Sequence, residues 1–185
     1  ISVCIFGREK GKNGFAVSMD YEEAGRIAAE YFCSHGCRKV AFVGGDPAWE
    51  IRSPLYKGWN SVFPACEGPA EPSCNLFQYA KDSVEQLDRL LERNPDGIFV
   101  FGCDYFLLDR RMSRKKRGKV RILTDENYSG TYGALHPPDA KLLLIPAEMA
   151  RTAAQELFRA MSEPEYKKEE IVFHASIRER RKGKI

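Results

Sequence analysis

The chain has 185 residues, of which 43% are hydrophobic and 30% are charged, and its formal net charge is +3. This length fits one domain or two small lobes of a globular protein. No apolar run approaches the roughly 20 residues needed to cross a bilayer, so no membrane partner is expected. The nearly balanced charge argues against a chain that binds DNA by itself, because such chains usually carry a larger basic excess on one face.

The start of the sequence and its cysteines bear on where the protein works. The first six residues, ISVCIF, have neither a basic segment nor a cleavage site, so they are not a signal peptide. Because the sequence begins without a methionine, we interpret it as a fragment that lacks an N-terminal part. The six cysteines form no C-x-x-C pair and show no zinc-ligand spacing with the three histidines. We therefore expect reduced thiols in a cytoplasmic protein, with no metal and no cofactor.

Short apolar segments alternate with helical patterns along the chain. Strands or extended segments are predicted at 1–6, 15–17, 39–43, 74–77, 97–101, 120–123, 141–145 and 171–177. Helices are predicted to begin at Asp20, Ser53, Asp82, Asp104 and Pro146. The last helix has a predicted apolar face of Ala150, Ala153, Ala154, Leu157, Phe158 and Met161.

This alternation predicts an α/β protein with a Rossmann-like, doubly wound parallel sheet. Ligands of such sheets bind at the carboxyl ends of the strands. The sequence contains no nucleophile elbow, no P-loop and no G-x-G-x-x-G pattern. Its three scattered histidines offer no visible nucleophile system, so we do not expect an enzyme.

Three residues that follow predicted strands are candidates for ligand contact. Asp104 and Asp125 could each accept hydrogen bonds from ligand hydroxyls, or could instead cap a helix or turn. From position alone, a capping role is favoured for Asp104, whereas ligand contact is slightly favoured for Asp125. Trp49 either stacks on the apolar face of a sugar or base, or packs on the neighbouring helix, and the sequence favours neither.

Basic residues gather in two runs, at 110–121 and at 178–184. We interpret both as solvated ends of helices and loops rather than as a nucleic-acid-binding patch. Cations are favourable near helix C-termini, and no aromatic residues alternate with these charges as they do in single-strand binders.

Six segments, taken in order, resemble the LacI/GalR family of bacterial transcription regulators. They are VSMDYEEAGRIAAEYFCSHGCRKVAFVGG, YKGWNSVF, DGIFVFGCD, RILTDEN, LLLIPAEMARTAAQELFRAM and ASIRERR, which together cover nearly the whole chain. The resemblance implies the type I periplasmic-binding-protein fold, in which two Rossmann-like lobes clamp a small-molecule effector, with the N-terminal lobe incomplete here. It also implies a sugar or sugar derivative as effector and a homodimer. Operator DNA would be bound only through a domain missing from this chain.

The resemblance further implies a division of the chain and a set of site residues. Residues 1–19 would end the N-terminal lobe, 20–145 would form the C-terminal lobe, and 146–185 would hold the crossover helix of the N-terminal lobe and the terminal strand. The ligand-binding residues would be Phe6, Trp49, Arg52, Cys103, Asp104 and Asp125. The sequence departs from the family pattern at Leu55, where an arginine is usual, with Arg52 nearby, and at Cys103, where asparagine is common.

Two other functions stay open at this point. A periplasmic sugar-binding protein would have the same fold, although six cysteines argue against an oxidising compartment. A Rossmann-type enzyme acting on nucleotides or sugars is the third possibility, and the absent phosphate loop argues against it.

Overall fold

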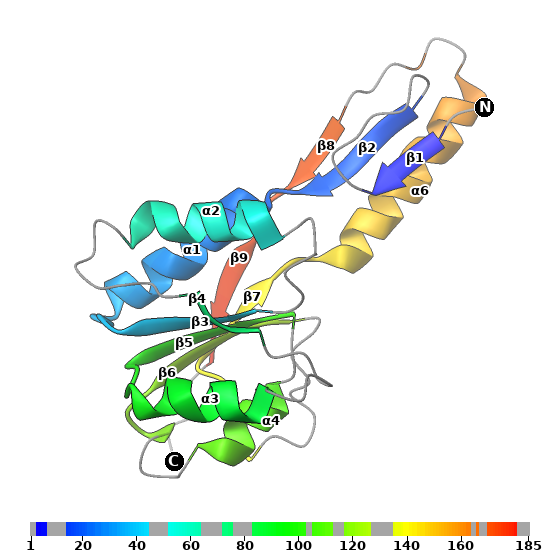
Figure 1. The fold of residues 1–185 in the computed structure, drawn as a ribbon. Coiled ribbons are helices and arrows are strands. Elements are labelled where there is room, and N and C mark those ends of the chain that lie inside the picture. The colour runs from blue at the N-terminus through cyan, green and yellow to red at the C-terminus, as the bar shows by residue number, and fades with distance from the viewer. Residues whose placement is uncertain are drawn as a thin grey trace. The chain divides into compact units, whose positions relative to one another are not determined.

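The computed structural model describes residues 3–6, 14–44, 52–63, 72–75, 83–102, 105–112, 117–126, 135–163, 166 and 170–180. These residues form two compact units (Figure 1). Unit 1 comprises Ile1–Asp20 and Leu144–Ala175, and unit 2 comprises Tyr21–Leu143 and Ser176–Ile185. The assignment of segments to an N-terminal and a C-terminal lobe stays a prediction.

Unit 1 is a small parallel sheet with one helix. Its strands are β1 (Val3–Phe6), β2 (Gly14–Met19) and β8 (Glu170–Phe173), in the order β1-β2-β8, and both pairs are parallel. Helix α6 (Pro146–Ser162) packs on this sheet through Ala153, which is buried with Phe15 and Val17. The helix at Pro146 is confirmed.

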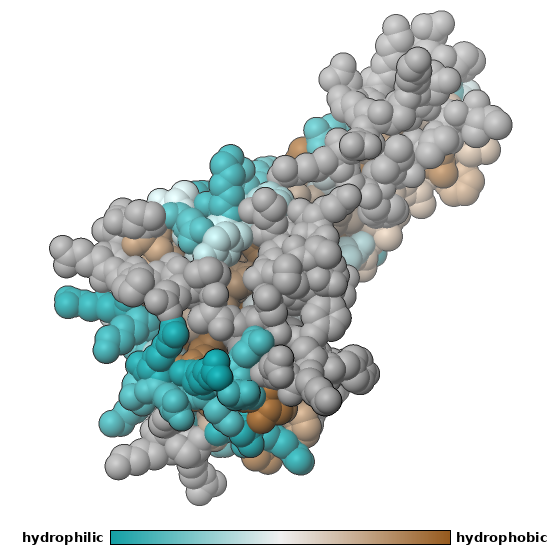
Figure 2. Space-filling model, viewed as in Figure 1, coloured by the Kyte–Doolittle hydropathy of each residue, from teal (hydrophilic) through white to brown (hydrophobic). Residues whose placement is uncertain are grey.

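The packed face of α6 differs from the predicted one. The side chains that pack toward the core are Met149, Ala153, Leu157 and Ala160. Phe158 and Met161, which the sequence pattern assigns to the buried face, are each 71% exposed. Apolar side chains are visible along this helix in Figure 2. A sheet of three strands is narrow, so it covers only part of the wide apolar surface of α6.

Unit 2 is built on a six-stranded sheet with helices on both faces (Figure 1). The strands, in chain order, are β3 (Val40–Gly44), β4 (Pro72–Asn75), β5 (Gly97–Phe101), β6 (Arg121–Asp125), β7 (Ala140–Leu143) and β9 (Ser176–Glu179). Their order in the sheet is β4-β3-β5-β6-β7-β9. All neighbouring strands are parallel except β7 and β9, which are antiparallel.

Helices α1 (Tyr21–Ser34) and α2 (Arg52–Val62) cover one face of this sheet, and α3 (Ser83–Glu92) and α4 (Tyr105–Arg111) cover the other (Figure 1). The predicted doubly wound α/β architecture is thus confirmed. Strands β3 and β5 are buried along their whole length, as their continuous apolar sequences predict.

One predicted strand was wrong. The segment 171–177 is not a single strand but two, because the chain leaves β8 at Phe173 and re-enters a different sheet at Ser176. Strand β8 pairs with β2 in unit 1, whereas β9 pairs with β7 in unit 2. The sequence has no glycine or proline between them to mark the break.

Alternate residues of the central strands fill two cores. On one side, Trp59 of α2 is fully buried among the rings of Phe32, Phe42, Phe63 and Phe99. On the other side, residues of β3, β5 and β6 pack against α3 and α4, with a core of Ala41, Val43, Leu87, Leu90, Leu91, Ile98, Val100, Tyr105, Leu108, Met112, Val120 and Ile122.

Helices α1 and α2 are in close backbone contact at two glycines. A Cβ atom on Gly25 would lie 1.9 Å from the carbonyl oxygen of Leu55, and one on Gly58 would lie 1.8 Å from that of Glu22. Only glycine permits this approach at either position. Leu55, where the family pattern has an arginine, is fully buried in this part of unit 2.

Candidate functional site

The carboxyl ends of three parallel strands of unit 2 lie side by side. Strand β3 pairs with β5 through Gly44 and Phe101, and β5 pairs with β6 through Val100 and Thr124. The last residues of these strands, Gly44, Phe101 and Asp125, are therefore neighbours at one edge of the sheet. This is the edge at which open α/β sheets bind their ligands.

Asp125 lies at this edge as the last residue of β6. Its side chain is fully buried, and its Oδ2 accepts a hydrogen bond of 2.9 Å from the backbone N–H of Gly102, the residue after β5. Gly102 has a φ of +64°, a backbone conformation that glycine adopts without strain. The carboxylate therefore holds Gly102, directly after β5, against the end of β6. This is a structural role, the alternative to ligand contact that the sequence leaves open for Asp125.

The other five predicted site residues are described only in part or not at all. Trp49, Cys103 and Asp104 lie outside the described residues. Phe6 ends β1 in unit 1 and Arg52 is the first residue of α2 in unit 2, but the side chains of both lie outside the described part. Their part in ligand binding stays a prediction.

Next to Asp125, the structure contains a buried polar group that the sequence analysis did not single out. Thr124 is fully buried, and its Oγ1 has no hydrogen-bond partner within the described part of the chain. Successive residues of a strand point to opposite faces, so Thr124 and Asp125 belong to different faces of the sheet. The feature of the sequence that could have identified Thr124 is a hydroxyl side chain next to the apolar residues of the segment RILTD.

A second buried carboxylate lies at the opposite edge of the sheet, near the amino end of β7. Asp109 of α4 accepts hydrogen bonds from the backbone N–H groups of Leu135 and His136. Its Oδ1 also lies 3.1 Å from Nδ1 of His136. The hydroxyl of Tyr105 donates to the carbonyl of His136 at 2.7 Å, and burial raises the pKa of Tyr105 to about 12. These bonds fix the segment that leads into β7. No local sequence pattern could predict these hydrogen bonds, because the bonded residues are 26 to 31 positions apart.

The metal-ligating residue types of unit 2 can be compared by the distances between their side chains. Among its described residues alone, no three histidine, cysteine, aspartate or glutamate side chains converge on one point. Cys33 and Cys37, the cysteines whose side chains are described, are not joined in a disulfide.

Comparison with solved structures identifies the fold. The chain is similar to a LacI-family transcriptional regulator from Enterococcus faecium with bound ribose (19% identity, TM-score 0.73, covering 96% of this chain and 68% of that one). It is similar to a periplasmic binding protein/LacI transcriptional regulator from Alkaliphilus metalliredigens complexed with D-xylulofuranose (23% identity, TM-score 0.68, 95% and 68%). A putative LacI-family repressor from Corynebacterium glutamicum also matches (18% identity, TM-score 0.72, 97% and 70%).

These similarities confirm the fold that the resemblance implied. The chain has the α/β fold of LacI-family transcriptional regulators, whose effector-binding domains share the periplasmic-binding-protein-like fold, and it spans about two thirds of the length of those structures. Neither a protein-family model nor a curated protein sequence matches it. In the described part of the chain, none of the helices combines the length and the apolar composition that a membrane crossing requires.

Proposed function

We propose that this chain is the effector-sensing domain of a bacterial regulator of the LacI/GalR type, and that its effector is a sugar or a close derivative. The observation that carries the proposal is the position of Asp125, a buried carboxylate at the ligand-binding edge of a doubly wound sheet. Solved structures of the same fold carry ribose or D-xylulofuranose, which supports a hydroxyl-rich ligand.

The chemistry of a carboxylate suits such a ligand. An ionised carboxylate has two oxygens and about four acceptor sites, so it can accept from several donors at once, and the backbone N–H of Gly102 is one of them. A hydroxyl that donates to a charged acceptor away from water makes a stronger bond than a neutral pair does. In this proposal Phe6, Trp49, Arg52, Cys103 and Asp104 complete the ligand-binding set, on the strength of the sequence resemblance.

The remaining elements of the proposal follow from the type of protein. The domain binds its effector without catalysing a reaction on it. It acts as a homodimer in the cytoplasm and contacts operator DNA through a further domain. Ligand binding would shift the population of two conformations and so change operator affinity.

The test is a sugar screen followed by one substitution. We expect D-ribose, D-xylulose or another pentose or hexose to raise the melting temperature of the intact protein, and calorimetry then gives the affinity. Asp125→Asn keeps an oxygen that can accept from Gly102 but removes the charge, so we expect effector affinity to fall roughly ten- to a hundredfold.

Asp96→Asn is the matched control. Asp96 also accepts backbone N–H groups, from Arg38 and Lys39, but it lies just before β5, at the opposite edge of the sheet. Its substitution should leave effector affinity unchanged. The proposal fails if no sugar binds, or if Asp125→Asn binds the effector as tightly as the parent protein.

A further inference from the structure

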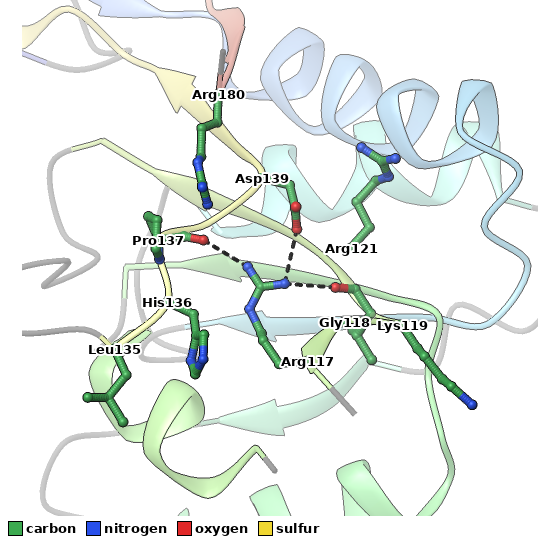
Figure 3. Close-up of a pocket in the computed structure, with 10 residues that line it drawn as sticks. Arg117, Gly118, Lys119, Arg121, Leu135, His136, Pro137, Asp139 and Arg180 are labelled. Atoms are coloured by element: carbon green, nitrogen blue, oxygen red, sulfur yellow. Dashed lines mark hydrogen bonds and ion pairs between the residues drawn. The ribbon is translucent and has the colours of Figure 1, made fainter. Parts of the chain in front are cut away.

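The amino edge of the unit 2 sheet contains a pocket that the proposed sugar site does not use. It has a volume of about 640 Å³ and lies where β6 and β7 begin and where β9 ends (Figure 3). Its lining is Arg117, Gly118, Lys119, Val120, Arg121, Leu135, His136, Pro137, Asp139 and Arg180. Asp125 is at the other end of β6, so the two sites are separate.

The lining is strongly basic. The lining includes four cationic side chains, Arg117, Lys119, Arg121 and Arg180, and a single carboxylate, Asp139. The lining therefore has a formal net charge of +3, the same value as the formal net charge of the whole chain. Figure 3 shows Arg180 extending toward the Arg117–Asp139 pair, whereas Lys119 and Arg121 point away from it. One described residue of the second basic run, Arg180, thus lines the same concave site as Arg117, Lys119 and Arg121 of the first run.

Arg117 and Asp139 form the floor of this pocket. Arg117 is 8% exposed, and its guanidinium donates to the carbonyls of Val120 and Pro137 at 3.0 and 2.8 Å and to Oδ2 of Asp139 at 3.3 Å. The same Asp139 oxygen accepts the backbone N–H of Ile122 at 2.8 Å. The Nε of Arg117 is buried with no hydrogen-bond partner within the described part of the chain. The carboxylate is therefore engaged by donors of the protein itself.

The other cations form no ion pair of this kind within the described part of the chain, although Asp139 also stabilises the charge of Arg121 at longer range. The backbone N–H of Arg180 donates to the carbonyl of Asp139 at 2.8 Å, which places Arg180 beside the floor, and Figure 3 shows its side chain extending toward Pro137 and the Arg117 guanidinium. Arg121 bonds to the hydroxyl of Tyr31 at 3.2 Å and lies over that ring. Among the described residues, no carboxylate is within ion-pair distance of Lys119, Arg121 or Arg180.

From this arrangement we infer a second ligand site: the amino-edge pocket binds a small polyanion, a phosphorylated or polycarboxylate metabolite with at least two negative charges. Guanidinium groups bind phosphate and carboxylate oxygens through paired N–H donors. A concave pocket of this volume is in the range of small-molecule sites, roughly 300–1,000 Å³. Leu135 and Pro137 supply an apolar wall for the carbon skeleton of such a ligand.

The test is calorimetry on the full chain with tripolyphosphate and, separately, with citrate, each at constant ionic strength. We expect saturable one-to-one binding of at least one of them, and the tighter one tells whether phosphate or carboxylate chemistry is preferred. Arg180→Gln, an exposed position, should lower the affinity about tenfold or more. Lys119→Gln should lower the affinity by less, because the Lys119 side chain points away from the Arg117–Asp139 pair (Figure 3).

Arg89→Gln is the control, since Arg89 is an exposed arginine on α3 that pairs with Glu85 outside the pocket. It should bind the anion as the parent does, and so should Asp125→Asn, because the sugar site is at the other edge. Absence of saturable binding for both anions would overturn the inference. So would an equal loss of affinity in Arg89→Gln and Arg180→Gln, which would indicate attraction to overall charge.

Discussion

Substitution of Gly58 by alanine tests the contact that holds α1 and α2 together. The new Cβ would lie 1.8 Å from the carbonyl oxygen of Glu22, where ordinary contact begins at 3.4 Å, and the nearest atoms are backbone. A backbone carbonyl cannot rotate away as a flexible side chain can. The two helices must therefore separate by more than 1 Å, which disturbs the packing of Trp59 next to Gly58.

The expected cost follows from two opposing effects. Overpacking of a closely packed interface costs about 1–3 kcal/mol, and loosening the aromatic cluster around Trp59 adds to it. Alanine regains up to about 1 kcal/mol because it favours a helix interior over glycine. We expect a net destabilisation of about 2–3 kcal/mol, which for a chain of this size lowers the melting temperature by roughly 4–12 °C.

The assay is urea unfolding followed by tryptophan fluorescence. The chain has two tryptophans, so a Trp49→Phe background leaves Trp59 as the reporter for unit 2. Lys57→Ala is the neighbouring control, because Lys57 is exposed and, within the described part of the chain, its side chain forms a surface ion pair with Glu22 alone. If Gly58→Ala were as stable as Lys57→Ala, the close approach of the two helices would be refuted.

Two further predictions concern single polar groups of unit 2. Asp96 accepts the backbone N–H groups of Arg38 and Lys39, both at 2.8 Å, so Asp96→Ala should lower the free energy of unfolding by about 1–3 kcal/mol and Asp96→Asn by less, as urea titration can show. Burial raises the pKa of the Cys37 thiol from 9.0 to about 11; Cys37 should therefore react with iodoacetamide at pH 8 more slowly than the less buried Cys33, as judged by peptide mass spectrometry. Because the pKa is raised in the folded state, the neutral thiol favours folding below pH 9, and this contribution is lost as the pH rises toward 11. Equal alkylation rates would contradict the burial of Cys37.

The sequence predicted those parts of the fold that depend on local pattern. Gly97–Phe101 is an unbroken apolar run, and the structure has a strand with the same bounds that is buried on both faces. The helix predicted from Asp20 begins at Tyr21, and the helix predicted from Asp82 begins at Ser83. In each case the residues that decide the element lie within it or just before it.

The predictions failed where distant segments decide the outcome. The division of the predicted strand at His174 and Ala175 depends on the partner strands, because β8 pairs with β2 and β9 pairs with β7. The residues at the division do not themselves indicate these partners. Similarly, Asp125 could be placed at a strand end from sequence, but its bond to Gly102 depends on the register of β5 against β6. The solvated interpretation of the run at 110–121 was wrong for Arg117, which is buried against residues up to 22 positions away.

Arg117 illustrates how a charged residue in a basic run becomes part of the structure. Its guanidinium joins the turn before β6, through Val120, to the segment before β7, through Pro137 and Asp139. Arg117→Met keeps the apolar stem but leaves two carbonyls without the guanidinium donor and the carboxylate of Asp139 without its cationic partner, although Asp139 keeps the backbone N–H of Ile122. We therefore expect a loss of about 3 kcal/mol in the free energy of unfolding.

A double-mutant cycle separates the ion pair from the bonds to the carbonyls. Adding Asp139→Asn to Arg117→Met removes the charge left without its partner, so the double variant should be more stable than the sum of the two single losses predicts. Arg110→Met, at an exposed arginine of the same run, should change stability by less than about 0.5 kcal/mol. If Arg117→Met were as mild as Arg110→Met, the buried network at the amino edge of the sheet would be wrong, because a solvated arginine contributes no such bonds.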